Sequence, residues 1–275
     1  MHRFHPVNLF RLCKKQPRSP LDPDGRMRAA YFVCTTHRSG SSLFCEGLKD
    51  AGLGDPNEYF DETLFGIWRE KWSLPESADA LAYLREMIAR QTSADGVFGA
   101  KLMWHQTDVL RQMLQPLVAP EQPKAKLADL LSAAFPGVRY FWLKRNDATA
   151  QAISLARAQQ TGRWHSTDTK GWVGVAPVAK EEHFDFAQID EIRGNLMMWD
   201  AQWGKFFKNP ALPVQTLVYE EFTPRYEETM RAALAFLGRK DSATWAIPAP
   251  RHEKLADATS EAWKAQFLAQ KAGAA

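Results

Sequence analysis

The residues best suited to bind a ligand are the small and cationic side chains of a short run, Thr-His-Arg-Ser-Gly-Ser-Ser, at positions 36–42. A β-rich run precedes these residues and a helical pattern follows them, so they are predicted to form a tight turn between a strand and a helix. Such a junction offers backbone N–H groups and the positive end of the helix dipole to an anion. Gly40 permits close approach of the backbone, and Ser39, Ser41 and Ser42 add hydroxyl donors. The turn therefore predicts an anion site, with a simple helix N-cap as the competing interpretation.

The turn differs from the Walker A loop of nucleoside triphosphatases. That loop requires GxxxxGK[ST], and here Thr35 replaces the first glycine and Ser41 replaces the lysine. A later predicted strand ends in Lys144 and Arg145 instead of an aspartate that could hold magnesium. Hydrolysis of ATP or GTP is therefore disfavoured. The planar guanidinium of Arg38 instead offers a positive charge to phosphate or sulfate oxygens without a metal.

A second anion-binding element is predicted after the strand at 138–143. Arg145 follows this strand, and Ser154 lies in the helix that begins at about residue 147. A guanidinium and a hydroxyl that converge from a strand end and a helix can hold a second phosphate. A surface arginine with no ligand is the alternative.

Strands and helices alternate along the chain and so position these residues. This order predicts an α/β fold of three layers, in which a central, mostly parallel sheet is flanked by helices and ligands bind at the carboxyl ends of the strands. Residues 162–185 lack periodicity and are expected to form a lid over a site or a surface insertion. The predicted strands are 31–36, 97–103, 138–143 and 214–219, and the predicted helices are 43–51, 78–91, 107–117, 124–135, a helix from 147, 186–208, 224–237 and the C-terminal tail.

Composition indicates one globular domain with a basic N-terminal arm. The 275 residues are 45% hydrophobic and 24% charged. Residues 1–28 hold seven Lys and Arg against two Asp, a local charge of +5, so we expect a partly disordered arm and a single domain over 29–275. The arm is expected to be solvated and not to bind nucleic acid, because no groove-reading motif accompanies it.

The apolar residues and the cysteines restrict the class of protein further. No run approaches the roughly 18 apolar residues of a membrane span, and no apolar signal segment precedes the first strand, so a cytoplasmic protein without an integral membrane segment is expected. Cys13, Cys34 and Cys45 lack CxxC spacing and are predicted to serve in packing. No metal site is predicted.

Four blocks of sequence, taken together, are similar to a known family. They are YFVCTTHRSGSSL at 31–43, DPNEYF at 55–60, GAKLMWHQ at 99–106, and the stretch 145–163. In this order the sequence resembles P-loop-related sulfotransferases, and specifically the bacterial trehalose 2-sulfotransferase family, over most of residues 29–265. The resemblance implies a P-loop NTPase-like sulfotransferase fold and a homodimer. It also implies metal-free transfer of a sulfuryl group from 3'-phosphoadenylyl sulfate (PAPS) to a hydroxyl of a carbohydrate or glycolipid.

The resemblance also implies residue roles. The turn from Arg38 to Ser42 is expected to hold the 5'-phosphosulfate of PAPS, and Arg145 with Ser154 is expected to hold its 3'-phosphate. Separately from the resemblance, Lys254 lies in the polar segment before the C-terminal helix and is a candidate to reach the 3'-phosphate, with a solvated lysine as the alternative. Glu58 corresponds to the family's proposed catalytic glutamate, and its pKa is expected to be raised by a nonpolar setting. Lys101 and Arg38 are expected to neutralise charge on the bridging oxygen. The acceptor-binding residues are expected to be His37, which replaces a sugar-contacting amide of the family, Asp55, Glu58, Tyr59, Phe60, Asp61, Trp68 and Trp104, with Trp164 as a further aromatic face.

Two other functions stay open at this point. A nucleotide-dependent kinase would share the fold, although the missing Walker lysine and carboxylate argue against it. A noncatalytic nucleotide-binding protein would keep the anion turn and perform no chemistry. Trp199 and Trp203 have the spacing of a buried helix face and are assigned to packing or to an oligomer contact.

Overall fold

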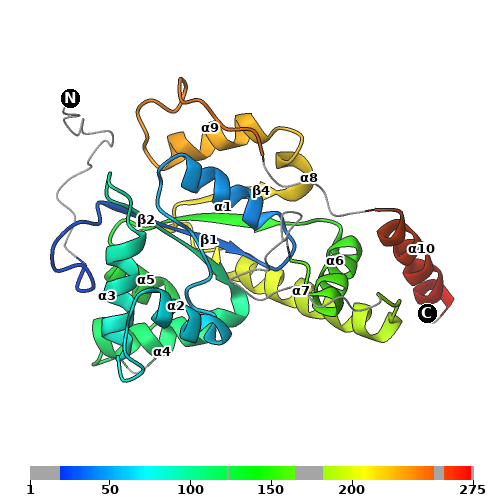
Figure 1. The fold of residues 1–275 in the computed structure, drawn as a ribbon, viewed down its shortest axis with the longest axis horizontal. Coiled ribbons are helices and arrows are strands. Elements are labelled where there is room, and N and C mark those ends of the chain that lie inside the picture. The colour runs from blue at the N-terminus through cyan, green and yellow to red at the C-terminus, as the bar shows by residue number, and fades with distance from the viewer. Residues whose placement is uncertain (1–18, 123, 165–181, 251–256, 274–275) are drawn as a thin grey trace.

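The computed structural model describes residues 19–122, 124–164, 182–250 and 257–273 (Figure 1). Most of the segment expected to be a lid, including His165 and Trp172, lies outside these residues, as do Cys13 and Lys254. No helix in the described ranges combines the length and apolar character that a bilayer span requires.

A four-stranded parallel sheet forms the centre of the described chain. The strands are β1 (Ala29–Thr35), β2 (Val97–Met103), β3 (Arg139–Lys144) and β4 (Val214–Val218), in the spatial order β2-β1-β3-β4. All pairs are parallel, so the carboxyl ends of the strands lie at one edge. The predicted fold class is confirmed, and each strand begins and ends within two residues of its predicted limits.

Helices cover both faces of the sheet (Figure 1). Side chains alternate across a strand, so Tyr31 and Val33 of β1 face the layer of α1, α8 and α9, while Phe32 and Cys34 face the layer of α3, α4, α5 and α7. Because both faces are buried, β1 reads as a continuous hydrophobic run from Ala29 to Cys34 instead of alternating with polar residues. The helices are α1 (Ser41–Asp50), α2 (Phe65–Lys71), α3 (Ala80–Gln91), α4 (Thr107–Val118), α5 (Leu127–Ala134), α6 (Ala148–Thr161), α7 (Phe186–Phe206), α8 (Tyr219–Phe222), α9 (Tyr226–Phe236) and α10 (Ala258–Gly273).

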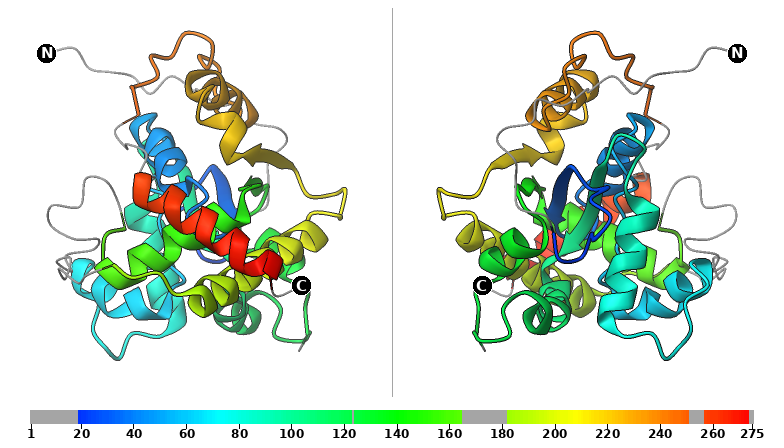
Figure 2. Two further views of the ribbon diagram at one scale, coloured as in Figure 1. Left: turned by 90° about the vertical axis from the view of Figure 1, so that its right-hand side faces the viewer. Right: turned by 90° about the vertical axis from the view of Figure 1, so that its left-hand side faces the viewer.

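The C-terminal helix α10 packs on the side of the molecule formed by α6 and α7. Figure 2 shows α10, in red, lying across α6. Trp263 and Phe267 are buried in a cluster with Ile153 of α6 and Ile189 of α7. This cluster is separate from the two clusters on the faces of the sheet, so α10 is attached chiefly through α6 and α7.

The chain before β1 is packed from Ser19 onwards. Leu21 is 1% exposed and belongs to the core on the α3–α5 side of the sheet. Asp22 accepts a hydrogen bond from the backbone N–H of Met27 at 2.7 Å, and the Ser19 hydroxyl donates to the carbonyl of Ala134. Ser19, Leu21 and Asp22 of the expected arm thus contact the domain, while residues 23–26 are exposed.

Candidate functional site

The predicted turn lies between β1 and α1 and has an unusual backbone. Arg38 has φ 59° and Gly40 has φ 83°, both in the left-handed region that favours glycine. A Cβ atom on Gly40 would lie 2.6 Å from Cδ2 of Tyr219, so the position also requires glycine for space. The first turn of α1 starts at Ser41, and its unpaired backbone N–H groups are therefore close to the glycine.

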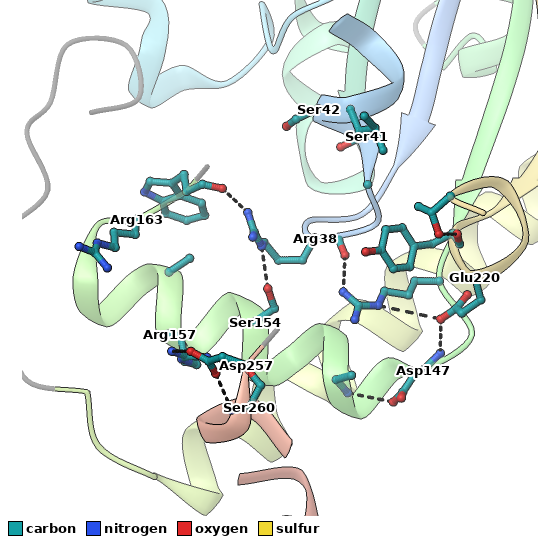
Figure 3. A pocket seen from close by; sticks show the side chains of 18 of the residues that line it. Arg38, Ser41, Ser42, Asp147, Ser154, Arg157, Arg163, Glu220, Asp257 and Ser260 are labelled. Carbon is teal, nitrogen blue, oxygen red and sulfur yellow. Dashed lines mark hydrogen bonds and ion pairs between the residues drawn. The ribbon is translucent and has the colours of Figure 1, made fainter. Parts of the chain in front are cut away.

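The turn opens onto a cavity of about 530 Å³ between α1, α6, α8 and α10, which we call the turn cavity (Figure 3). Its volume lies within the roughly 300–1,000 Å³ of small-molecule sites. The structure brings together six of the expected PAPS-binding residues along its wall: Arg38, Gly40, Ser41, Ser42, Arg145 and Ser154.

Ser39 differs from the other residues of the turn. Its side chain is fully buried, and its hydroxyl lies 2.5 Å from the hydroxyl of Thr35. The Thr35 hydroxyl also donates to the carbonyl of Leu143 on β3 at 3.1 Å. The expectation that the Ser39 hydroxyl faces the anion is therefore wrong; this hydroxyl fixes the turn to the sheet.

Two guanidinium groups are held across the turn cavity. Arg38 donates from Nε to Oγ of Ser154 at 3.0 Å and from Nη1 to the carbonyl of Trp164. Arg145 donates from Nη1 to the carbonyl of Arg38 at 2.9 Å, and its guanidinium carbon lies 4.7 Å from the ring centroid of Tyr219. Nε of Arg145 is buried and has no hydrogen-bond partner among the described residues. Arg145 is thus firmly oriented and still has a donor to offer.

Two further cations of the turn cavity, Arg157 and Lys264, are held in ion pairs. Arg157 of α6 lies 2.8 Å from Glu182 and forms a two-pronged contact with Asp257, at 2.6 and 2.9 Å. Nζ of Lys264 on α10 lies 2.6 Å from Oδ2 of Asp147. Sequence reasoning missed both cations. Arg157 carried a signal, since it follows Ser154 by three residues and so lies on the same helix face.

Glu58 and Lys101 form a buried ion pair beneath the turn. Nζ of Lys101 lies 2.7 Å from Oε1 of Glu58, and the two side chains are 7% and 6% exposed. The backbone places them, because the Lys101 N–H on β2 donates to the carbonyl of Asn57 at 2.9 Å. Nε2 of Gln106 donates to Glu58 at 3.2 Å and to Asp61 at 3.3 Å. The structure thus joins three of the expected site residues.

The charges of this pair stabilise each other. Burial raises the pKa of Glu58, but the positive charge of Lys101, the nearby His37, and hydrogen bonds from Lys101 and Gln106 outweigh burial and lower it below its ordinary value. Burial lowers the pKa of Lys101, but the Glu58 carboxylate outweighs this effect and raises it. The expected raised pKa of Glu58 is therefore wrong, because a buried lysine stands beside the carboxylate. Glu58 is ionised at neutral pH.

Several expected acceptor-binding aromatic residues belong to the core. Tyr59, Phe60 and Trp68 are 0%, 0% and 3% exposed, and their rings pack on other core side chains. They do not offer a free face to a sugar, and that expectation is corrected. Trp104 packs edge-on against Trp203, with ring centroids 4.9 Å apart. Asp55 pairs with Lys49 at 2.7 Å.

Other rings gather near Glu58. His37 stacks on His105 with ring centroids 5.2 Å apart and an interplanar angle of 10°, and His105 lies 5.1 Å from Trp199. The centroid of Trp164 is 6.5 Å from that of His37. Burial is the main cause that lowers the pKa of His37 to about 4. The neighbouring His105 and Lys101 also lower it, and Glu58 and Asp61 oppose the shift. The neutral imidazole can therefore both donate and accept. Sequence reasoning missed His105 and assigned Trp199 to packing.

Comparisons with known proteins agree on one family. The family model described as Stf0 sulphotransferase matches residues 30–270. Trehalose 2-sulfotransferase from Mycobacterium tuberculosis is 24% identical over 269 residues, which cover 87% of this chain and 94% of that protein. Trehalose 2-sulfotransferase from Mycolicibacterium smegmatis is 26% identical over 264 residues, which cover 86% and 94%.

Two solved sulfotransferases resemble the chain more distantly. The one from Alicyclobacillus acidocaldarius is 17% identical with a TM-score of 0.43, and the match covers 88% of this chain and 92% of that chain. Sulfotransferase STF9 from Mycobacterium avium is 11% identical with a TM-score of 0.42, and the match covers 89% and 68%.

Proposed function

The chain belongs to the Stf0 sulphotransferase family, and from that premise we propose that it transfers a sulfuryl group from PAPS to a hydroxyl of a carbohydrate. The observation that carries the proposal is the cationic wall of the turn cavity. Arg38 and Arg145 approach it from two elements, with the hydroxyls of Ser41, Ser42 and Ser154. PAPS has two separate anionic groups, and this arrangement offers each of them a guanidinium and a hydroxyl.

The proposed placement of PAPS follows from the backbone. The 5'-phosphosulfate lies against Arg38 and the first turn of α1, where N–H groups and the helix dipole favour an anion. The 3'-phosphate lies against Arg145, whose Nε has a hydrogen to donate, and against Ser154. Ser154 accepts from Arg38 through its oxygen, so its O–H hydrogen is left to donate to the ligand. PAPS supplies the sulfuryl group, and no metal is required in this proposal.

The proposed chemistry is an in-line displacement with Glu58 as general base. The ionised carboxylate takes the proton of the acceptor hydroxyl while the acceptor oxygen forms a bond to sulfur. The sulfur–oxygen bond to the 5'-phosphate breaks, and the phosphate leaves with the electron pair as adenosine 3',5'-bisphosphate (PAP). Arg38 contributes a positive charge close to Lys101, and both cations favour negative charge developing on the leaving oxygen.

The proposed acceptor is trehalose or a related sugar, free or in a glycolipid. Both relatives carry the name trehalose 2-sulfotransferase. Neutral His37 and His105, with Trp199 and Trp164 beside them, offer hydrogen-bonding groups and flat apolar faces near Glu58, as a sugar ring requires. A homodimer and a cytoplasmic location belong to the same proposal.

The first test compares ligands on the unmodified protein. PAP is expected to raise the melting temperature strongly, whereas ATP with magnesium is expected to raise it weakly, because only PAP carries a 3'-phosphate. Labelled sulfate from PAPS is expected to appear on trehalose or on another sugar of an acceptor panel. A larger shift with ATP, or no shift with PAP, would contradict the proposal and favour the kinase or the noncatalytic alternative.

The second test removes the base. Glu58→Gln is expected to abolish transfer, a loss of about 100- to 10,000-fold, with PAP affinity within about twofold of the unmodified protein. Glu62→Gln is the matched control, since Glu62 lies on the same segment and forms no ion pair among the described residues. Wild-type turnover in Glu58→Gln would exclude Glu58 as the base.

A further inference from the structure

The helix α10 forms one wall of the turn cavity, opposite the phosphate turn. Ser260, Glu261 and Lys264 line the cavity from this helix. Trp263 and Phe267, on its other face, are buried against α6 and α7. The helix therefore presents a polar face to the site while its apolar face fixes it to the domain.

Asp147 lies between two cations of the cavity. Its Oδ1 caps α6 by accepting from the Ala150 N–H at 2.9 Å, and its Oδ2 accepts from Lys264 at 2.6 Å. Burial raises the pKa of Asp147, but the Ala150 N–H, Lys264 and the charge of Arg145 together lower it. Lys264 thus contacts the Asp147 carboxylate directly, and Arg145, whose ion-pair partner at 4.0 Å is Glu220, is close enough for its charge to act on Asp147.

Two of the unassigned cations of the cavity, Arg157 and Lys264, have carboxylate partners and differ in their freedom to move. Arg157 contacts Glu182, Asp257 and Ser260 at once, and Figure 3 shows it directed to the two residues of the α10 end. Lys264 has a single ion-pair partner among the described residues, and its side chain is 32% exposed. A lysine carries its charge on a flexible four-carbon stem with three donors. Lys264 is therefore the cation that can change partners at small cost.

We propose that Lys264 is a donor-binding residue that leaves Asp147 for the 3'-phosphate of PAPS, so that α10 becomes part of the donor site. This inference rests on the proposed function. A phosphate monoester carries about two negative charges at neutral pH and three acceptor oxygens, against one charge on the carboxylate. The exchange gives Lys264 and Nε of Arg145 a common anion, since this Nε donates no hydrogen bond among the described residues and its ion-pair partner, Oε1 of Glu220, is 4.0 Å away. Asp147 keeps its cap on α6 throughout.

The test compares two lysines of the same helix with two ligands. Lys264→Met removes the proposed contact, while Lys271→Met removes an ion pair of similar length, 2.7 Å to Asp190, that does not line the cavity. PAP and AMP differ only in the 3'-phosphate. Lys264→Met is expected to weaken the binding of PAP by about tenfold, about 1.4 kcal/mol. It is expected to change the affinity for AMP by less than about twofold. Lys271→Met is expected to change neither, and all proteins are expected to melt within a few degrees of one another.

A second variant tests the exchange itself. Asp147→Asn removes the competing charge but keeps an N-cap of equal quality. It is expected to bind PAP several-fold more tightly, and Lys264→Met in that background is expected to remove the gain. The inference would be overturned if Lys264→Met lost equal affinity for PAP and for AMP. It would also be overturned if Lys264→Met and Asp147→Asn each bound PAP as tightly as the unmodified protein. If the unmodified protein does not bind PAP, the proposed function fails instead.

Discussion

Replacing Lys101 by methionine isolates the energetic role of the buried pair with Glu58. The two charged atoms are 2.7 Å apart, and at an effective dielectric constant of about 20 their attraction is about 6 kcal/mol. Desolvation of both groups opposes this attraction, and removal of one partner from a buried pair typically costs about 3–5 kcal/mol. Methionine keeps the length of the side chain, so little of the loss comes from packing. We expect Lys101→Met to lower the free energy of unfolding by about 3–5 kcal/mol near neutral pH.

The pH dependence gives the sign of the effect. In the unmodified protein the pKa of Glu58 is lowered below its ordinary value of 4.5. The ionised carboxylate therefore stabilises the fold above pH 4.5, and this stabilisation is lost as pH falls through the pKa of the folded protein. In Lys101→Met, burial without a partner raises the pKa of Glu58. Its carboxylate then destabilises the fold as pH rises through that value. The difference between the two proteins is expected to grow from acidic to neutral pH.

Urea denaturation at several pH values measures this difference, and the double variant Glu58→Gln/Lys101→Met is the control. Removal of both charges is expected to recover much of the stability, because no unpaired charge is left in the interior. The acid limb of the kcat/KM profile is expected to move to higher pH in Lys101→Met, because Glu58 must ionise without a partner. A loss below about 1 kcal/mol, with no change in its pH dependence, would refute a buried, ionised pair.

Two further substitutions test the turn and its support. Gly40→Ala is expected to destabilise the fold and weaken PAP binding more than Gly52→Ala. Both positions have positive φ, but only a Cβ on residue 40 would lie 2.6 Å from Tyr219. Equal effects of the two substitutions in thermal melts and PAP titration would contradict the steric argument. Trp203→Phe is expected to cost about 2–4 kcal/mol in urea denaturation, because buried Trp203 donates to the Thr35 carbonyl at 3.0 Å; a cost below about 1 kcal/mol would show that the bond contributes little.

The sheet and the long helices could be predicted from the sequence because their signals are local. β1 is a continuous β-rich run, and α7 repeats apolar residues at helical spacing over 21 residues. The helix α2 was missed, since its seven residues include Gly66 and are too few to show a period. It forms because Trp68 packs on Tyr59, with ring centroids 4.9 Å apart, and this contact is tertiary.

The turn of the candidate site could be predicted from the sequence because backbone chemistry defines it. The turn depends on glycine, small hydroxyls and a strand–helix junction, all adjacent in sequence. The aromatic residues of the Glu58 segment carried no such information, because Tyr59 looks the same whether its ring faces a sugar or the core. Its hydroxyl donates to the carbonyl of Asp55, and the Trp68 N–H donates to the carbonyl of Glu58 at 3.2 Å, so both polar ends are satisfied inside the protein. The pair of Arg157 and Asp257 joins positions 100 residues apart, beyond any local pattern.

Arg38 connects the turn cavity with the Glu58–Lys101 pair. Its side chain donates to Ser154, and its positive charge repels that of Lys101, which slightly opposes the rise in the pKa of that lysine. An anion bound at the turn offsets this repulsion, because its negative charge lies against the guanidinium. Across the cavity, the proposed exchange has an incoming 3'-phosphate replace Asp147 as the partner of Lys264 while Asp147 remains the cap of α6. In this proposal, ion pairs hold Lys101 and Lys264 in position for an anionic ligand.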